Sequence, residues 1–204
     1  MEDRTEHWES VYSTRGPHAV SWYQVRPETS LRLIDALGVG RDEAVIDVGG
    51  GASNLVDHLI ERGFGRLTVL DISAAALVAA KDRLGARAAA VRWLVADIAR
   101  ANPEGPYRLW HDRAVFHFLI EPAERRHYVA AMAAALPPGA HAIIATFAED
   151  GPERCSKLPV RRYSPDRLAA ELGAGFTLLE SLREVHVTPA GGEQKFVYCC
   201  FRRG

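Results

Sequence analysis

A glycine-rich turn between a predicted strand and a predicted helix is the first place where this sequence could do chemistry. The run from Asp47 to Asn54 reads Asp-Val-Gly-Gly-Gly-Ala-Ser-Asn and overlaps the apolar stretch 44–48. Glycine tolerates positive φ and lets a ligand approach the main chain. The start of the following helix offers unpaired N–H groups and partial positive charge. The run therefore predicts a ligand-binding turn, and a tight strand–helix turn without a ligand is the competing interpretation.

Acidic residues end the next two predicted strands. Asp71 follows the apolar run 66–70, and its carboxylate can accept both hydroxyls of a ribose. Capping of the next helix is the alternative for Asp71, although Ser73 is available as that cap. Asp97 follows 91–96 and can accept a hydrogen bond from an adenine amino group. Because ligands of open α/β sheets bind at the carboxyl ends of the strands, these groups predict one adenosine site.

The glycine spacing indicates which nucleotide this site would take. A dinucleotide fingerprint needs a third glycine five residues after the first, for close packing beside a pyrophosphate. Counted from Gly49, that position holds Asn54. The sequence therefore favours an adenosine ligand without a pyrophosphate.

Composition indicates an ordinary globular domain. The chain has 204 residues, of which 48% are hydrophobic and 25% charged, so it can bury a sizeable core. Its 25 basic and 26 acidic residues give a net charge of −1, which argues against a nucleic-acid partner and against a membrane surface. We also find no apolar run of membrane-spanning length, and the charged start, Met1–Glu6, is unlike a signal peptide.

Three cysteines are too few for a disulfide scaffold. Cys155, Cys199 and Cys200 have no metal-ligand spacing, so no metal site is expected. The odd count suits a reducing compartment, and we predict a cytoplasmic location. The alanine and arginine bias suggests a bacterial gene.

Alternating strand-like and helix-like runs predict an α/β fold with a parallel sheet. A helix follows Pro27, with Thr29 or Ser30 as its cap. Ser73 is the predicted cap of a later helix, and Ser164-Pro165 is predicted to begin another. The last two apolar runs, 176–187 and 195–201, are joined through Pro189 and two glycines and predict an antiparallel hairpin. The predicted parallel strands are 44–48, 66–70, 91–95, 108–112 and 141–147.

Taken together, these motifs resemble the class I, seven-stranded, S-adenosylmethionine-dependent methyltransferases. The segment 47–53 looks like the first motif of that family, with Ser53 in place of its last glycine. Residues 70–73 and 96–98 are similar to the second and third motifs. Residues 110–119 resemble the fourth, which borders the reacting methyl group, and 137–140 resemble the turn before the fifth strand.

The resemblance covers roughly residues 27–204. It implies a doubly wound, mostly parallel sheet in the strand order 3-2-1-4-5-7-6, with helices on both faces and a C-terminal antiparallel hairpin. It also implies S-adenosyl-L-methionine as the cofactor and S-adenosyl-L-homocysteine as the product. The cofactor-binding residues expected from the motifs and the leader are Asp47, Gly49, Gly50, Gly51, Ser53, Asn54, Asp71, Ile72, Ala96, Asp97, Ile98, Asp112, Arg113, Trp22 and Tyr23.

Residues 1–26 form a polar and aromatic leader before this domain. Its segments 7–12 and 21–24 look like the N-terminal part of a subgroup that includes protein-lysine methyltransferases and small bacterial enzymes. The resemblance implies that Trp22, Tyr23 and Tyr12 lie over the cofactor as a lid. Packing of these aromatic side chains onto the domain is the alternative.

Methyl transfer from a sulfonium is an in-line displacement, so the protein mainly orients the acceptor and excludes water. A protonated acceptor would need a base, and the candidate catalytic residues are His117, Asp112 and Tyr23. A structural role is the alternative for His117, and an ion pair with Arg113 is the alternative for Asp112. His111 is expected on a strand, facing the core or a helix. Cys155 is either a plain thiol or a thiolate for a soft metalloid substrate.

The acceptor remains open at this stage. A small molecule is favoured because the chain has no added recognition domain, and a protein lysine is second because of the leader. Nucleic acid is third, since the sequence lacks the Asn/Asp-Pro-Pro-aromatic run of base-amino methylases. An NAD-dependent oxidoreductase and a non-catalytic nucleotide-binding module are the alternatives from other classes. We expect a monomer or a homodimer.

Overall fold

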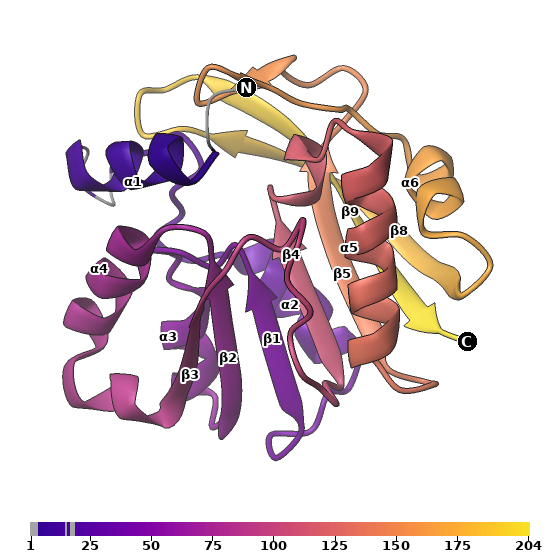
Figure 1. The fold of residues 1–204 in the computed structure, drawn as a ribbon, viewed down its shortest axis with the longest axis horizontal. Helices are drawn as coiled ribbons and strands as arrows, with labels where there is room; N and C mark the ends of the chain where they lie inside the picture. Colours follow the sequence, from indigo (N-terminus) through magenta and orange to yellow (C-terminus); the bar gives the residue numbers. More distant parts are fainter. Residues whose placement is uncertain (1–3, 15, 17–18) are drawn as a thin grey trace.

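A single mixed sheet organises the protein (Figure 1). The computed structural model describes residues 4–14, 16 and 19–204; the predicted leader therefore lies partly outside the described residues, at 1–3, 15, 17 and 18. The sheet has seven strands in the order β3-β2-β1-β4-β5-β9-β8. Two short strands, β6 (Arg154–Cys155) and β7 (Leu158–Pro159), pair with each other outside this sheet. The last two strands of the seven-stranded sheet are therefore numbered β8 and β9. The predicted order is thus confirmed.

The parallel strands lie close to their predicted bounds, because each is a short apolar run closed by a turn. They are β1 (Ala44–Val48), β2 (Arg66–Asp71), β3 (Val91–Val95), β4 (Leu109–Arg113) and β5 (His141–Phe147). The central strand β1 pairs with β2 on one side and β4 on the other, so Val48 is level with Leu70 and Asp112. This register brings the carboxyl ends of three strands to one edge of the sheet.

Helices cover both faces of the sheet. α2 (Glu28–Ala36), α3 (Leu55–Glu61) and α4 (Ala74–Leu84) bury their apolar sides in one core, and α5 (Pro122–Ala135) and α6 (Pro165–Leu172) in the other. Two 3-10 turns, η1 (Gly85–Ala90) and η2 (Phe116–Phe118), complete the set. The neighbours Cys199 and Cys200 enter opposite cores, as expected for a strand.

The predicted cap at Ser73 and the predicted helix start at Ser164 are confirmed, and Ser164 also acts as a cap. Ser73 Oγ accepts the Ala76 N–H at 3.1 Å, and Ser164 Oγ accepts the Arg167 N–H at 3.3 Å. The cap proposed for α2 was wrong: the helix begins at Glu28 with Pro27 at the cap position and no side-chain cap. Ser30 is instead fully buried inside the helix, where its hydroxyl contacts His111.

The predicted C-terminal hairpin is confirmed as β8 (Phe176–Val187) and β9 (Glu193–Arg203). β9 also runs antiparallel to β5, which places the hairpin at the sheet edge. The leader helix α1 (Arg4–Thr14) lies beside α4 and above the carboxyl ends of the strands (Figure 1).

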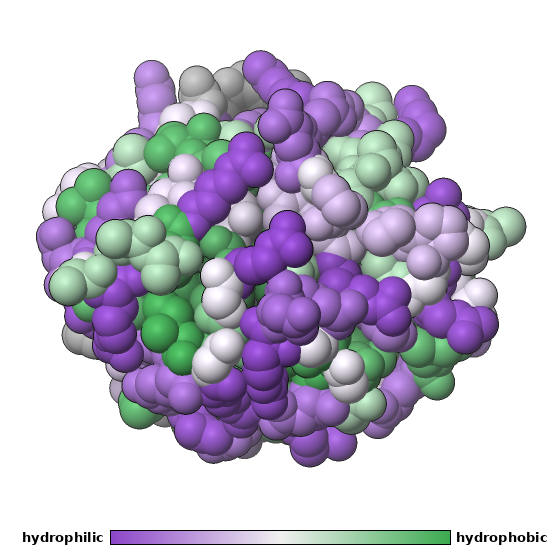
Figure 2. Space-filling model, turned by 90° about the horizontal axis from the view of Figure 1, so that it is seen from below, coloured by the Kyte–Doolittle hydropathy of each residue, from purple (hydrophilic) through white to green (hydrophobic). Residues whose placement is uncertain are grey.

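The opposite end of the molecule is seen from below in Figure 2, where hydrophilic side chains cover most of the surface and smaller apolar areas lie between them. In the part of the chain that the structure describes, no helix has the length and apolar character needed to cross a membrane.

Candidate functional site

Two adjoining cavities lie at the carboxyl ends of the central strands, beneath the leader. The first cavity brings together five predicted cofactor residues from two strand ends: Asp71, Ile72, Ala96, Asp97 and Ile98. The second is lined by the predicted residues Asp47, Gly50, Ser53 and Tyr23. Gly49, Arg113, Trp22 and Tyr12 line both cavities.

The glycine turn is shaped by steric demands that only glycine meets. Gly49 has φ +68°, and a Cβ there would lie 1.9 Å from Val115 Cγ2. Gly51 has φ +40°, and a Cβ there would lie 2.7 Å from Asp71 Oδ2. The turn therefore runs close to the carboxylate of the next strand, as a shared ligand would require.

Asp71 is a buried carboxylate in the first cavity. It is 6% exposed, and its Oδ1 accepts the Ser73 N–H at 2.9 Å. Burial, with a smaller contribution from the nearby Asp47, raises its pKa to about 7 in spite of the lowering effect of that hydrogen bond. A carboxylate in such surroundings suits neutral hydroxyl donors, which is what a ribose offers.

Asp97 marks the other end of the first cavity. Its Oδ1 accepts the Ala99 N–H at 2.9 Å, and its Oδ2 lies 3.7 Å from Arg4 Nη2 in α1. Arg4 also pairs with Glu124 of α5. The leader therefore reaches the rim of the predicted adenine site through an ion pair.

The leader closes the cavities with aromatic side chains. Trp8 packs edge-on against Trp22 and Phe118, with ring centroids 5.5 and 5.1 Å apart. Tyr12 accepts a hydrogen bond from Trp22 Nε1 at 3.2 Å. Glu9 accepts the N–H groups of Ala74 and Ala75, which fixes α1 to the start of α4.

The decisive comparison concerns this glycine turn and its neighbours. A family model described as "Methyltransferase domain" matches residues 45–139, which include the turn, Asp71, Asp97 and β4. These residues therefore form a methyltransferase domain of the class I, S-adenosylmethionine-dependent type. The cofactor of this family is S-adenosyl-L-methionine. A search of curated protein sequences finds no significant match.

Solved structures resemble the methyltransferase over nearly its whole length. One, from work on the conversion of a disulfide bond into a thioacetal group during echinomycin biosynthesis, has a TM-score of 0.79 at 22% identity and covers 98% of this chain and 91% of its own. The 1,6-didemethyltoxoflavin-N1-methyltransferase of Burkholderia thailandensis, bound to its substrate and S-adenosylhomocysteine, scores 0.73 at 21% identity, with coverages of 98% and 87%. The N-methyltransferase NodS of Bradyrhizobium japonicum, also with S-adenosylhomocysteine, scores 0.74 at 18% identity, with coverages of 98% and 99%. At these identities the likeness establishes the fold.

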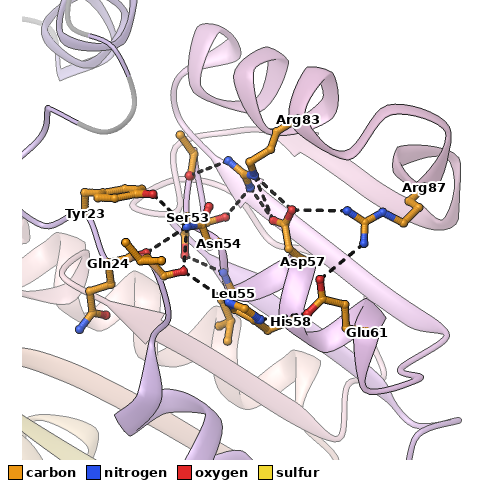
Figure 3. Close-up of polar contacts among 12 residues, drawn as sticks. Tyr23, Gln24, Ser53, Asn54, Leu55, Asp57, His58, Glu61, Arg83 and Arg87 are labelled. Atoms are coloured by element: carbon orange, nitrogen blue, oxygen red, sulfur yellow. Dashed lines mark hydrogen bonds and ion pairs between the residues drawn. The ribbon is translucent and has the colours of Figure 1, made fainter.

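Asn54 was predicted to contact the cofactor, but its side chain lies outside both cavities. It is absent from the lining of both cavities, and its Nδ2 donates to the carbonyls of Gln24 and Val25 at 3.1 and 3.0 Å (Figure 3). Tyr23 Oη lies 3.4 Å from the same nitrogen. Asn54, which stands where a dinucleotide fingerprint has its third glycine, therefore connects the leader to the glycine turn by hydrogen bonds.

Arg83 supports the same turn from α4 (Figure 3). Its guanidinium donates to the carbonyls of Ala52 and Ser53 at 2.9 and 2.8 Å and pairs with Asp57 at 2.7 Å. Ser53 lines the second cavity, and its Oγ accepts the Leu55 N–H at 3.1 Å. The departure from glycine at this position is therefore accommodated by a local hydrogen bond.

Asp47 and His111 join neighbouring strands. Asp47 Oδ1 lies 2.7 Å from His111 Nδ1, and His111 Nε2 lies 2.9 Å from Ser30 Oγ. His111 lies in β4 and is buried against α2, as expected, but it also lines the second cavity. Since both ring nitrogens are engaged, this histidine orients Asp47 toward the second cavity.

Asp112 is a structural anchor in the methyltransferase, against the prediction of a base or cofactor ligand. It is fully buried and lines neither cavity. Its carboxylate accepts the Tyr128 hydroxyl at 2.6 Å and the N–H groups of Val115 and Phe116 at 2.9 and 3.1 Å. Burial raises the pKa of Asp112 to about 6. Its hydrogen bonds to Val115 and Phe116 hold the turn after β4 in place.

His117 is likewise placed in the core and lines neither cavity, so the structure does not support it as a base. Its Nδ1 accepts the Phe147 N–H at 3.2 Å, while Nε2 has no hydrogen-bond partner within the described part of the chain. Burial lowers its pKa to about 3, with Arg113 adding to the effect. Of the three candidate bases, only Tyr23 lines a cavity.

Cys155 also faces the first cavity, from β6. It is 4% exposed, and burial raises its pKa to about 12, so the thiol is protonated at neutral pH. This protonation state argues against the interpretation of Cys155 as a thiolate that binds a soft metalloid substrate. Among the described residues, no three metal-ligating side chains gather at one point.

Sequence reasoning missed several residues that line the first cavity. For all but Arg4, the only signal was apolar or aromatic character within or beside a motif or in the leader, which also fits ordinary core packing; Arg4 is a charged residue of the leader and carried no signal. The missed residues are Arg4, Trp8, Leu70, Ala114, Val115, Phe118 and Leu119.

Proposed function

We propose that this methyltransferase transfers the methyl group of S-adenosylmethionine to a small-molecule acceptor in the first cavity. The observation that carries this proposal is the closure of that cavity by the leader. Trp8, Trp22 and Phe118 pack together over it, and α1 is fixed to the start of α4. A site roofed in this way suits a molecule that is enclosed, whereas a polymer needs an open groove.

The cofactor fits the residues that line the two cavities. Asp71 would bind the ribose hydroxyls, Asp97 the adenine amino group, and Ile72 and Ile98 the faces of the adenine ring. The low solvation and the pKa of Asp71 near 7 favour neutral hydroxyl donors at this carboxylate. In the second cavity, Asp47 and the turn at Gly49 and Gly50 would hold the methionine part.

When bound, S-adenosylmethionine supplies a methyl group on a positively charged sulfur. The chain's own contribution is to position the acceptor and exclude water, which can be worth effective molarities of about 10⁵–10⁸ M. Trp22 and Tyr12 line both cavities, and their aromatic faces suit a cation, with about 0.5–2 kcal/mol for such contacts. We accordingly propose residues 1–26 as a lid and 27–204 as the cofactor-binding domain.

Protein-lysine methylation is the second candidate, since the same aromatic cluster could accept a lysine side chain. The two are separated by incubating the enzyme with methyl-labelled S-adenosylmethionine and a cell extract divided by dialysis. Our proposal expects label in the low-mass fraction, with reduced transfer by the Asp71→Asn variant at subsaturating cofactor. Label confined to the protein fraction would contradict a small-molecule acceptor. A cytoplasmic location and a monomeric or homodimeric state remain predictions.

A further inference from the structure

Arg113 occupies the junction of the two cavities. It is the last residue of β4, and its side chain is only 10% exposed. Its guanidinium carbon lies 4.4 Å from the centre of the Phe196 ring. The side chain thus places a permanent cation where the methionine end of the cofactor and the acceptor would meet.

The backbone after Arg113 holds this position firmly. Ala114 has φ +72°, a conformation that costs a residue with a Cβ roughly 1–2 kcal/mol. The Asp112 carboxylate accepts the N–H groups of Val115 and Phe116 and so stabilises the strained turn. Strain of this kind is kept where the surrounding structure over-determines it, which is common at binding sites.

The hydrogen bonds of Arg113 leave one terminal nitrogen, Nη2, without a hydrogen-bond partner among the described residues. Nε donates to Tyr198 Oη at 2.8 Å and Nη1 donates to the Trp22 carbonyl at 3.0 Å. Nη2 makes no hydrogen bond within the described residues. Glu184 Oε1 lies 3.6 Å from Nη2, an ion pair beyond hydrogen-bond length, and the same oxygen lies within reach of Gln24 and Tyr198.

The first cavity offers little to deprotonate an acceptor. The titratable side chains that line it, among those the structure describes, are Arg4, Tyr12, Asp71, Asp97, Arg113 and Cys155. Burial raises the pKa of both Tyr12 and Cys155, so neither takes up a proton as a base at neutral pH. Asp71 and Asp97 are the residues proposed for ribose and adenine. An ammonium acceptor would meet Arg113 and find no dedicated base, whereas an anion needs none.

We propose that Arg113 binds an anionic acceptor, so that the small molecules methylated here are acids such as thiols, phenols, carboxylic acids or acidic ring N–H groups. This inference rests on the proposed function and names the acceptor class for the same site. The Arg113 side chain is nine-tenths buried, and its Nη2, although ion-paired with Glu184, makes no hydrogen bond within the described residues. A guanidinium in this state favours a negative ligand because charge-assisted hydrogen bonds strengthen away from water.

The reaction balances without a proton transfer inside the site. The acceptor loses its proton to solvent before or during binding and arrives as an anion. A lone pair of that anion forms the bond to the methyl carbon, and the carbon–sulfur bond breaks with its electron pair moving to sulfur. The methylated acceptor atom and the thioether sulfur are both neutral after the reaction. The product has therefore lost the negative charge that bound it to Arg113, which favours its release.

The test compares a charged probe with a neutral probe of the same shape. Benzoate and benzamide are titrated calorimetrically into the S-adenosylhomocysteine complex of the full chain. We expect benzoate to bind at least about tenfold more tightly, the scale of one hydrogen bond to a charged group. Equal affinities, or no benzoate binding at millimolar concentration, would overturn the inference while leaving cofactor binding, and with it the proposed function, intact.

Variants then assign the preference to Arg113. Arg113→Gln alone leaves Glu184 without its partner and can fail to fold, so Arg113→Gln/Glu184→Gln is made alongside it. We expect both to lose the benzoate preference, Arg113→Lys to retain part of it, and the exposed Arg202→Gln on β9 to retain all of it. Persistence of the preference in the double variant would contradict the proposal.

The cofactor carboxylate is the other anion that Arg113 could bind. S-adenosylhomocysteine carries that carboxylate, whereas 5′-methylthioadenosine lacks it. We expect the double variant to bind each within about threefold of wild type. A loss of tenfold or more for S-adenosylhomocysteine alone would assign Arg113 to the cofactor and overturn the acceptor role.

Discussion

The Trp22 carbonyl accepts a hydrogen bond from Arg113 Nη1 at 3.0 Å, which joins the leader to the end of β4. Next to it, the Ser21 carbonyl lies 2.8 Å from His186 Nε2 on β8. The second half of the leader is therefore attached to both the central sheet and the terminal hairpin. It forms a wall of the site, while α1 forms the roof.

Loosening the roof should speed cofactor release. In Trp8→Ala, the edge-on contacts with Trp22 and Phe118 are lost, and such pairs are worth about 0.5–1.5 kcal/mol each. We expect S-adenosylhomocysteine to dissociate about threefold to tenfold faster in stopped-flow fluorescence. Global stability should change little, because α1 contains no buried residue.

The control for this prediction is Trp93→Phe, at a tryptophan on β3 that bonds the Ala88 carbonyl away from the leader. It should leave the dissociation rate unchanged. If Trp8→Ala instead lowers the unfolding midpoint strongly, the leader is core structure and the assignment of a lid is wrong.

Cofactor affinity should depend on pH through Asp71. Burial raises the pKa of this carboxyl to about 7, and the ionised form is the better acceptor for two hydroxyls. Affinity for S-adenosylhomocysteine should therefore rise by up to about tenfold between roughly pH 6 and pH 8. Asp71→Asn should weaken binding by about 1–3 kcal/mol and flatten this dependence.

Calorimetric titrations between roughly pH 6 and pH 8 measure both the affinity of each variant for S-adenosylhomocysteine and its dependence on pH. Asp166→Asn, at an exposed position in the first turn of α6, is the matched control and should behave as wild type. An unchanged affinity in Asp71→Asn would contradict the ribose assignment.

Much of the fold could be predicted because its signals are local. Short apolar runs, glycine stops, the cap at Ser73 and the helix start at Ser164 each depend on a few neighbouring residues, and the structure confirms them. Asp71 and Asp97 were predictable as neighbours because parallel strands end at one edge of a sheet.

The rest depends on contacts between segments far apart in the sequence. Asn54 was interpreted only as the residue that replaces the third glycine of a dinucleotide fingerprint. In the structure, its side-chain amide donates hydrogen bonds to the carbonyls of Gln24 and Val25. His117 and Asp112 lie beside the site in sequence, and only the packing of η2 and α5 shows that both side chains point into the core. No local spacing encodes these directions.

Gly49 should be intolerant of even one methyl group. Gly49→Ala combines positive φ with a clash against Val115 Cγ2 at 1.9 Å, whereas Gly63→Ala has positive φ and open space. We expect Gly63→Ala to lower the free energy of unfolding by about 1–2 kcal/mol and Gly49→Ala by a further 1–3 kcal/mol or so. Denaturant titrations measure both.

The double variant Gly49→Ala/Val115→Ala separates the two causes. It should recover much of the additional loss, since the clash is removed and the backbone strain remains. Equal costs at Gly49 and Gly63 would show that the turn relaxes and that Val115 does not constrain it.

His117 should make the fold sensitive to acid. Its pKa is 6.5 in the unfolded chain and about 3 in the folded protein, because burial disfavours the imidazolium. Its contribution to stability is therefore complete above pH 6.5 and is lost as the pH falls from 6.5 toward 3, on the order of several kcal/mol in total. His117→Gln should flatten the fall in unfolding free energy over this range.

His127→Gln is the matched control, because His127 lies at the surface of α5 with one bond to the Ala101 carbonyl. It should keep the wild-type slope. If His117→Gln also keeps that slope, the imidazole is not the buried neutral group described above.

The central claim is that the two cavities bind S-adenosylmethionine, and the most direct measurement is calorimetric titration of the wild-type chain with S-adenosylhomocysteine, with NAD alongside. The account predicts micromolar or tighter binding of S-adenosylhomocysteine at one site per chain and none of NAD. Binding of NAD alone, or of neither, would contradict it.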